Sequence, residues 1–353
     1  MKRILVVKVT SLGDVIQAQA VVGDLHRAFP GVIVDWAVDE AFADIPRWNP
    51  GVERVLCAPL RRFKKMRNLR DLSAIWSSIS DLRREKYDLV VDLHGVYKSA
   101  IISFLTRSKR RFGYSRANLG EAGAAFAYTH RFAPRRDDNA WEGMRRTLSE
   151  TFGYSIEPFP PTVLAIPKPK VAPQAVSDMP FALLFHATSK AEKKWPAANW
   201  VAVAKALVER GLTPLLPWGT DAERIDAEAI AREVPNSRVL PRLTIEEIAQ
   251  HVDLAALVVG TDTGLVHLAS ALRKPTVMIF SATSRPHFGV NIPGVCLSVG
   301  DEGRPPSVEE VLAAIRAVEQ GKQEEAGQAP TSTQCHTAPD SNSTPPATKP
   351  ASR

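Results

Sequence analysis

The sequence predicts an α/β protein of two domains, each built on an open parallel β-sheet with helices on both faces. Its 353 residues exceed the size that a single hydrophobic core usually reaches. Short β-branched runs alternate with helical patterns on both sides of PKPKVAPQAVSDMP (167–180). This segment has four prolines and no apolar periodicity, which is typical of an interdomain linker. Strands that alternate with helices form β-α-β units, and these units require parallel strands.

The first predicted domain covers residues 1–166. RILVVKV (3–9), one amphipathic helix from Asp14 to Phe29 and VIVDWAV (32–38) form its first β-α-β unit. The pattern then continues with two apolar runs and three helical stretches. The further expected strands are 52–58 and 88–95, and the further expected helices are about 72–85, one from near Tyr97, and 138–152.

The second predicted domain covers residues 181–321 and repeats the alternation. Its expected strands are 181–187, 212–219, 237–240, 256–260 and 275–280, and its expected helices are 198–210, one after Asp221, one opening at Thr244, and 264–272. Glu247 stands three residues after Thr244, the spacing of a capping box. Ligands of open parallel sheets bind at the carboxyl ends of the strands, so the active site is expected in the cleft between the domains.

Residues 322–353 are rich in Ser, Thr, Pro and Ala and nearly free of large apolar side chains, which predicts a disordered and dispensable tail. No run of about 18 apolar residues exists, so no membrane-spanning helix is predicted. The N-terminal residues have the pattern of a strand and lack the features of a signal peptide. The protein is therefore expected in the cytoplasm. Three cysteines without CxxC spacing support neither a disulfide framework nor a zinc site.

The net charge is +7, and charges within the tail cancel. The excess of positive charge on the folded part favours an anionic partner. Nucleic acid, a membrane surface and a phosphorylated substrate are the candidates. No nucleic-acid-binding motif accompanies the charge, so nucleic acid is the least favoured of the three.

The first strand leads into VTSLGDVIQ, where small residues allow another molecule to approach the backbone. Neither the dinucleotide fingerprint nor the P-loop is present. Asp14 at the helix start has two interpretations. It is an ordinary N-cap, or, at a strand end that faces the cleft, it is a general base.

GTDTGLVHLASAL (260–272) places a turn and a helix after a buried strand. The free N–H groups and dipole of that helix favour a phosphate, to which Thr263 adds a hydroxyl, while His267 follows in the first turn. An ordinary capping turn with a half-buried histidine is the alternative interpretation of this motif.

Two further loops follow neighbouring strands of the same predicted sheet. Thr188, Ser189 and Lys193 in HATSKAEKKWP suit a diphosphate leaving group, unless the loop is simply solvated. Trp218 and Glu223 in LLPWGTDAER suit a nucleoside, although Glu223 is equally explained as a first-turn helix charge. Three such loops at one sheet edge support a ligand site more strongly than any one alone.

A basic run, LRRFKKMRNLR (60–70), surrounds Phe63 and Met66. Its basic residues are Arg61, Arg62, Lys64, Lys65, Arg67 and Arg70. A solvated face, docking at anionic lipid head groups and binding of acceptor phosphates are three interpretations of this run.

Several of these segments, in this order and at these intervals, resemble the lipopolysaccharide heptosyltransferase I family. They are KVTSLGDVIQ, VDWAVDEAFADIPRWNPGVERV, RRFKK, DLHGVYKSA, HATSKAEKKWP, LPWG and TDTGLVHLASAL, and the resemblance spans about residues 1–320. It implies an inverting GT-B glycosyltransferase with two Rossmann-like domains, without metal or cofactor. The implied donor is ADP-L-glycero-D-manno-heptose, the implied acceptor the first Kdo of Kdo-lipid A, and the implied location the cytoplasmic face of the inner membrane, as a peripheral protein.

The resemblance also implies roles for individual residues. Asp14 matches the general base, and Lys193 matches a group that stabilises the leaving diphosphate. The implied donor-binding residues are Thr188, Ser189, Lys193, Glu223, Leu243, Asp262, Thr263, Gly264 and His267. The implied acceptor-binding residues are Ser11, Gly13, Arg61, Arg62, Lys64 and Lys65. No role is carried over to Ser284, and Asn139 stands where some relatives have histidine.

Three other functions stay open on the sequence. A heptosyltransferase II would use the same donor with a heptose acceptor. A sugar-nucleotide epimerase of the same architecture would need no separate acceptor. A nucleotide-binding regulatory module, tethered to a membrane by the basic run, would bind ADP without turnover.

Overall fold

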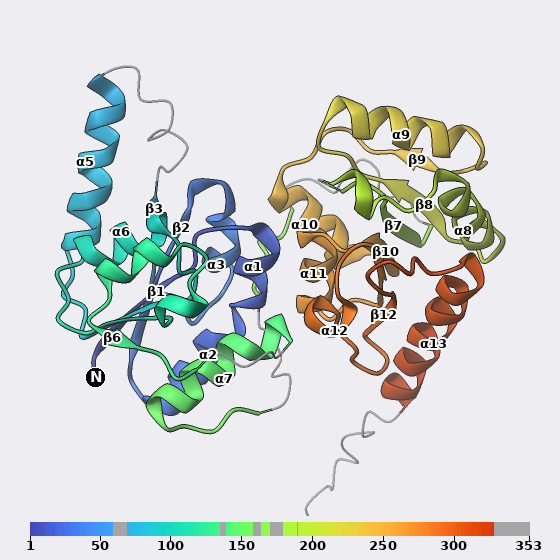
Figure 1. Ribbon diagram of the computed structural model, residues 1–353. Coiled ribbons are helices and arrows are strands. Elements are labelled where there is room, and N and C mark those ends of the chain that lie inside the picture. The colour runs from blue at the N-terminus through green and yellow to red at the C-terminus, as the bar shows by residue number, and fades with distance from the viewer. Residues whose placement is uncertain (59–68, 135–138, 158–163, 170–178, 189, 328–353) are drawn as a thin grey trace, which may run out of the picture.

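The computed structural model describes residues 1–58, 69–134, 139–157, 164–169, 179–188 and 190–327. Within these ranges the chain forms two six-stranded sheets that stand side by side, and all their strand pairs are parallel (Figure 1). The predicted fold class, two open parallel sheets covered by helices, is confirmed.

The two sheets share one topology. In spatial order, the first contains β3 (Arg54–Ala58), β2 (Ile33–Asp39), β1 (Arg3–Val7), β4 (Leu89–Asp92), β5 (Arg111–Gly113) and β6 (His130–Arg131). The second contains β9 (Arg238–Val239), β8 (Thr213–Leu216), β7 (Phe181–Phe185), β10 (Leu257–Thr261), β11 (Thr276–Phe280) and β12 (Cys296–Gly300). The strand order reverses between β1 and β4 and between β7 and β10, and such switch points are where open sheets bind ligands.

Helices cover both faces of the first sheet because its central strand is apolar on both sides. Ile4 and Val6 belong to the core under α1, α2 and α7, whereas Leu5 and Val7 belong to the core under α5 and α6. These helices are α1 (Leu12–Gln17), α2 (Ala20–Ala28), α5 (Leu69–Arg83), α6 (Tyr97–Leu105) and α7 (Ala140–Phe152); the short α3 (Asp44–Arg47) and the 3-10 turns η1 (Glu40–Phe42), η2 (Arg116–Asn118) and η3 (Ala122–Ala127) complete this half.

The second sheet is covered in the same way. Leu184 and Val259 lie in the core with α8, α9 and α13, while Leu183 and Val258 face α10 and α11. The elements of this half are η4 (Ala191–Lys193), α8 (Ala197–Glu209), α9 (Asp221–Arg232), α10 (Ile245–Leu254), α11 (Gly264–Ala271), α12 (Arg285–Phe288) and α13 (Val308–Gly327). Thr244 caps α10 in the capping box expected with Glu247.

The single helix expected over 14–29 is wrong, because the structure has α1 and α2 with a turn between them. Buried amides satisfy the backbone at this break. Asn49 Nδ2 donates to the carbonyl oxygen of Gln19 at 3.3 Å, and Gln19 Nε2 donates to that of Val15 at 3.0 Å. A tertiary contact from a distant residue therefore ends a helix that the local pattern would continue.

The expected start of the tail at residue 322 is also wrong, since α13 (Val308–Gly327) extends past that position. The rest of the expected tail lies outside the described residues, as does most of the expected linker. The sequence analysis did not predict β5, β6, β12, α12 or α13. The first two of these strands have three and two residues, too short to show periodicity, and β6 is also the edge strand of its sheet.

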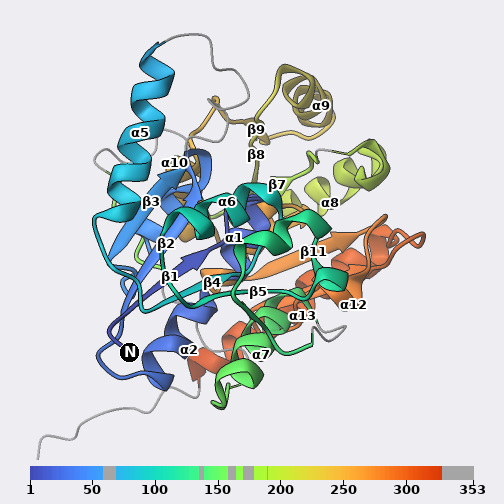
Figure 2. The same ribbon diagram turned by 60° about the vertical axis from the view of Figure 1, so that its left-hand side comes forward.

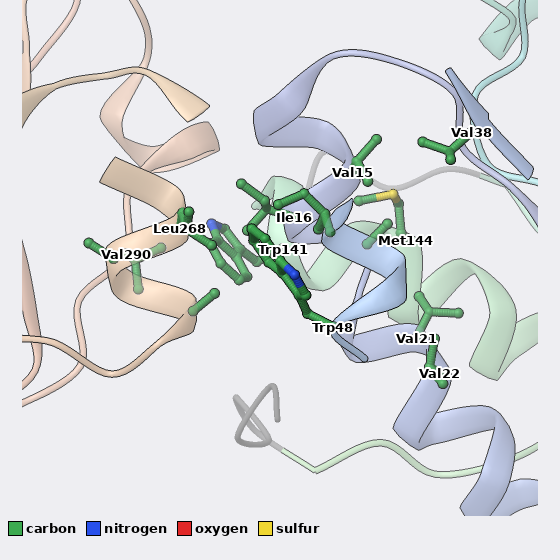
Figure 3. Packing of buried hydrophobic residues seen from close by; sticks show 14 of the residues in the cluster. Val15, Ile16, Val21, Val22, Val38, Trp48, Trp141, Met144, Leu268 and Val290 are labelled. Carbon is green, nitrogen blue, oxygen red and sulfur yellow. The ribbon is translucent and has the colours of Figure 1, made fainter. Parts of the chain in front are cut away.

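The two halves share a continuous apolar contact beside the cleft. Figure 3 shows Trp141 of α7 close to Leu268 of α11 and to Val290, which belong to the other half. Asn139, at the start of α7, donates from Nδ2 to the carbonyl oxygens of Gly289 at 2.7 Å and Pro286 at 3.1 Å. These contacts hold α7 against the second half.

Candidate active site

A cavity of about 720 Å³ lies between the two halves. It is bounded by α1 on one side and by loops that follow β7, β8, β10 and β11 on the other. The predicted site residues that line it are Ser11, Gly13, Asp14, Thr188, Lys193, Glu223, Leu243, Asp262, Thr263, Gly264 and His267. The fold therefore gathers at one place residues that are up to 256 positions apart in the sequence (Ser11 and His267).

Asp14 lies in the first turn of α1, directly after β1. Ser11 is the N-cap, and it donates to Asp14 Oδ2 from its backbone N at 3.0 Å and its Oγ at 2.7 Å. Asp14 is therefore the third helical residue, and the N-cap interpretation of Asp14 is wrong. Lys8 Nζ lies 3.0 Å from Asp14 Oδ1, and 44% of the aspartate side chain stays exposed.

The charge state of Asp14 follows from these partners. Burial would raise the pKa of its carboxyl, but the Lys8 ammonium and the hydrogen bonds from Ser11 outweigh burial and hold the pKa below its ordinary value. The carboxylate is ionised at neutral pH and can accept a proton from a group in the cavity.

The two halves come closest where α1 meets α11. A Cβ atom on Gly264 would lie 2.7 Å from Leu12 Cγ and 2.9 Å from the backbone N of Gly13. A Cβ atom on Gly13 would lie 3.4 Å from the imidazole Cδ2 of His267. The first contacts are too close for a side chain and the second is ordinary van der Waals contact, so it is Gly264 that permits the backbone approach between the Asp14 turn and the N-terminus of α11.

Asp262 is the centre of a second polar cluster, at the end of β10. Its Oδ2 accepts from Lys193 Nζ at 2.7 Å and from Thr283 Oγ1 at 2.8 Å, and its Oδ1 lies 3.1 Å from His267 Nε2. Burial opposes ionisation, but the hydrogen bonds and charges of His267 and Lys193 outweigh it and hold the pKa of Asp262 well below its ordinary value. Asp262 is therefore a fixed anion that orients a lysine, a histidine and a threonine.

The N-terminus of α11 opens onto the cavity beside this cluster. Thr263 is its N-cap, so the first N–H groups of the helix have no intrahelical acceptor. The hydroxyls of Thr263 and Thr188 are buried and have no hydrogen-bond partner within the described part of the chain. Free amides, two unpartnered hydroxyls and the positive end of a helix dipole make an anion-binding corner.

Part of the cavity lining is apolar. The apolar lining residues include Pro217, Trp218, Leu243, Ile245, Ile248 and Phe288. The Trp218 ring is fixed because its Nε1 donates to the carbonyl oxygen of Leu240 at 2.7 Å. Such a surface suits the plane of an aromatic base.

Glu223 borders the cavity as the third residue of α9. Its Oε2 accepts from the backbone N of Gly219 at 2.7 Å and of Thr220 at 3.1 Å, which completes a capping box with Thr220. The alternative explanation as a first-turn helix residue is therefore correct, and the same carboxylate also reaches the cavity.

Comparison with known proteins identifies the family. The sequence model of glycosyltransferase family 9 (heptosyltransferase) matches residues 75–310. Lipopolysaccharide heptosyltransferase 1 of Pseudomonas aeruginosa is 35% identical over 287 residues, which are 80% of this chain and 79% of that protein. The chain belongs to glycosyltransferase family 9. It is a glycosyltransferase, and the resemblance to heptosyltransferases found in the sequence is confirmed.

Solved structures of this family agree in fold. E. coli heptosyltransferase WaaC with ADP is 28% identical and has a TM-score of 0.75, with 91% of this chain and 99% of that chain covered. WaaC with ADP-2-deoxy-2-fluoro heptose, also 28% identical, has a TM-score of 0.68 and covers 92% of this chain and 99% of that chain. The GT-B architecture expected from the resemblance is confirmed.

Some predicted site residues cannot be placed. Ser189 and the basic-run residues Arg61, Arg62, Lys64 and Lys65 lie outside the described residues. Across the part of the chain that the structure describes, no group of three or more His, Cys, Asp or Glu side chains is arranged to hold a metal ion. No helix of the described ranges is long and apolar enough to cross a membrane.

The structure also adds residues that the sequence analysis missed. Lys8 contacts Asp14, Thr283 contacts Asp262, and Gln17 and Phe288 line the cavity. A charged residue inside the apolar run RILVVKV was a usable signal for Lys8. Thr283 follows β11, so the strand-end argument applied to the other three loops would also have found it.

Proposed function

We propose that this glycosyltransferase moves L-glycero-D-manno-heptose from ADP-L-glycero-D-manno-heptose to the first Kdo of Kdo-lipid A, in the biosynthesis of the lipopolysaccharide inner core. The observation that carries the proposal is the interdomain cavity, where the Asp14 carboxylate stands beside the anion-binding N-terminus of α11. The similarity to lipopolysaccharide heptosyltransferase 1 supports the choice of acceptor, and the WaaC complexes support the choice of donor.

The second half supplies the donor site in this proposal. The diphosphate lies at the N-terminus of α11, where it receives bonds from free amides and from the Thr188 and Thr263 hydroxyls. Adenine lies between the apolar side chains near Trp218 and Leu243, and Glu223 lies where ribose hydroxyls would be bound. Lys193, oriented by Asp262, stabilises the charge that grows on the departing ADP.

The first half supplies the base. Asp14 takes the proton of the Kdo hydroxyl while that oxygen attacks the anomeric carbon of heptose. The bond from the anomeric carbon to the diphosphate oxygen breaks, and ADP leaves with the electron pair, so the configuration inverts. Lys8 keeps Asp14 ionised before the reaction. Ser11 fixes the rotamer of the carboxylate through its two hydrogen bonds.

The location follows from the acceptor. Kdo-lipid A is membrane-bound, so we propose that the protein acts as a peripheral protein on the cytoplasmic face of the inner membrane. The basic run that includes Arg61, Arg62, Lys64 and Lys65 contributes contacts to acceptor phosphates in this proposal, as the resemblance implies.

The test is transfer of heptose to purified Kdo-lipid A, measured by mass spectrometry of the lipid, with Asp14→Ala in parallel. We expect a mass increase of one heptose with the wild type and none with the variant. Product on heptosylated lipid but not on Kdo-lipid A would instead establish a heptosyltransferase II. Isomerised sugar released from the donor alone would establish an epimerase, and ADP binding without any turnover would establish a regulatory module.

A further inference from the structure

One face of α6 presents large apolar side chains to solvent. Tyr97, Ile101 and Phe104 are spaced four and three residues apart, so they form one stripe along the helix, and they are 49%, 48% and 52% exposed. Phe126 of η3 is 53% exposed, and its ring centroid lies 5.8 Å from that of Phe104. We call these four side chains the α6 patch. Exposed apolar groups that cluster in this way mark interaction surfaces.

The surroundings of the α6 patch are strongly basic. Residues 96–131 contain seven Lys and Arg residues and one acidic residue, Glu121, a formal net charge of +6 in a chain whose total is +7. The guanidinium carbon of Arg111 lies 5.6 Å from the ring centroid of Phe104. The exposed basic residues of this segment are Lys98, Arg107, Lys109, Arg110, Arg116 and Arg131. Exposed aromatic and aliphatic groups on a segment rich in Lys and Arg are typical of membrane-interfacial surfaces.

The helix that carries the α6 patch packs tightly against the first sheet. Ser99, Ala100 and Ser103, on the opposite face of α6, are fully buried, and Ser103 Oγ donates to Asp92 Oδ2 at 3.2 Å. Figures 1 and 2 show α6 and α5 together on the first half, and the core beneath them is separate from the core that reaches the second half. The patch therefore faces away from the interdomain contact.

The N-terminal end of α6 lies near the acceptor side of the cavity. Lys8 Nζ lies 3.0 Å from Asp14 Oδ1 and donates at 3.4 Å to the carbonyl oxygen of Leu93, which together with His94 belongs to the loop that leads into α6. The strand-end loop that carries His94 thus connects the start of the α6 patch with the surroundings of Asp14. A bilayer in contact with the α6 patch would place its lipids at the edge of the interdomain cavity that is nearest to Asp14.

We infer that the α6 patch docks this protein on an anionic phospholipid bilayer. The four apolar side chains enter the interfacial region, and the surrounding Lys and Arg side chains contact lipid phosphates. A second copy of the chain is a poorer occupant, because a symmetric contact would press two surfaces of the same +6 segment together. This inference rests on the proposed function for its choice of a membrane-bound acceptor, and it assigns the docking to a surface distinct from the basic run.

The test is co-sedimentation of the full chain with vesicles that contain no acceptor lipid. The double variant Ile101→Ser/Phe104→Ser should lower the affinity for mixed phosphatidylcholine and phosphatidylglycerol vesicles about tenfold or more, because it removes two inserted side chains. Lys109→Glu/Arg110→Glu should lower it by about tenfold as well. The charge variant should change nothing on pure phosphatidylcholine, where wild-type binding is weaker.

Control variants carry comparable numbers of substitutions on the second half. Ile225→Ser/Leu254→Ser removes side chains that are 58% and 48% exposed, and Lys205→Glu/Arg316→Glu reverses two exposed charges, on α8 and α13. These controls should bind vesicles as the wild type does, and thermal unfolding should show all variants folded.

Several results would overturn the inference. The inference would be wrong if the wild type did not bind anionic vesicles, or if the patch variants bound them like the wild type. It would also be wrong if the control variants lost as much affinity as the patch variants. A wild-type dimer in light scattering that Ile101→Ser/Phe104→Ser converts to a monomer would make the patch an interface between copies. Because no acceptor is present, loss of vesicle binding in the patch variants alone would support the docking even if heptose transfer were not found.

Discussion

The two halves of the cavity each present an aspartate beside a lysine, and the two pairs differ. Asp14 is paired with Lys8 and Ser11, and 44% of its side chain is exposed. Asp262 is paired with Lys193 and further partners, and only 9% of its side chain is exposed. The same chemical pair is thus open to substrate on one side and enclosed on the other.

In the proposed mechanism, this difference in exposure separates a reacting carboxylate, Asp14, from a positioning one, Asp262. A general base needs a lone pair that a substrate hydroxyl can reach, and the exposed side of Asp14 provides it. Asp262 has its oxygens directed at protein groups, so its effect on substrate passes through Lys193 and His267. Four substitutions test this division of roles.

Asp14→Asn should have the largest effect. The amide cannot take the acceptor proton, so we expect kcat to fall by about a thousandfold at unchanged affinity for ADP. Steady-state transfer kinetics and calorimetry with ADP measure the two quantities. Asp44→Asn is the control, because Asp44 is another acidic first-turn residue with 42% side-chain exposure, and it should change neither.

Asp262→Asn should come next, with kcat/KM reduced by about a hundredfold and the affinity for ADP altered too. Lys193 and His267 lose the carboxylate that orients them, and both line the donor cavity. Asp301 follows β12 and does not line the cavity, so Asp301→Asn should leave both quantities unchanged. If Asp262→Asn lowered kcat and left ADP binding intact, the two aspartates would share one role and the division would be wrong.

Gly264→Ala tests whether α1, which carries Asp14, must lie this close to the start of α11, which follows Asp262. The new Cβ would meet Leu12 and Gly13, so we expect about tenfold lower kcat/KM and a free energy of unfolding reduced by about 1–3 kcal/mol. Urea denaturation measures the second quantity. Gly23→Ala is the control, since the nearest atom to its Cβ is Arg27 Nη1 at 4.0 Å, and full stability is expected there. Equal behaviour of the two variants would contradict the close-approach argument.

Lys8→Met should have the smallest effect on the maximal rate, below about tenfold, and should act mainly on the pH profile. Lys8 lowers the pKa of Asp14, whereas burial raises it, so removing Lys8 raises that pKa. A base is active only when deprotonated, so the acidic limb of kcat/KM should move to higher pH. A limb that stayed in place would show that Asp14 does not control it.

The fold was predictable where local patterns agree with tertiary structure. Apolar strands and the Thr244–Glu247 capping box were placed correctly, because a buried strand or a cap is recorded in a few adjacent residues. The break between α1 and α2 was not predicted, since it depends on Asn49 thirty residues away. Edge strands such as β6 have two residues and no pattern to detect.

The site was predictable as a set of strand-end loops and through the family resemblance. The hydrogen bonds and ion pairs among its residues were not predictable. Nothing adjacent in the sequence shows that Lys193 and Thr283 share the carboxylate of Asp262. Likewise Ser11, rather than Asp14, became the cap of α1, because the turn geometry sets which residue precedes the helix. The roles of the predicted site residues stay predictions until the substitutions above are measured.

The sequence by itself determined two parallel α/β sheets, the loops that follow their strands and the membership in a glycosyltransferase family, because each of these depends on patterns within short segments. Only the tertiary structure decided which loops meet, that Gly264 lets α1 and α11 touch, and that one aspartate is open while the other is enclosed. These properties depend on distances between residues far apart in the chain, and such distances are fixed when the two halves pack together.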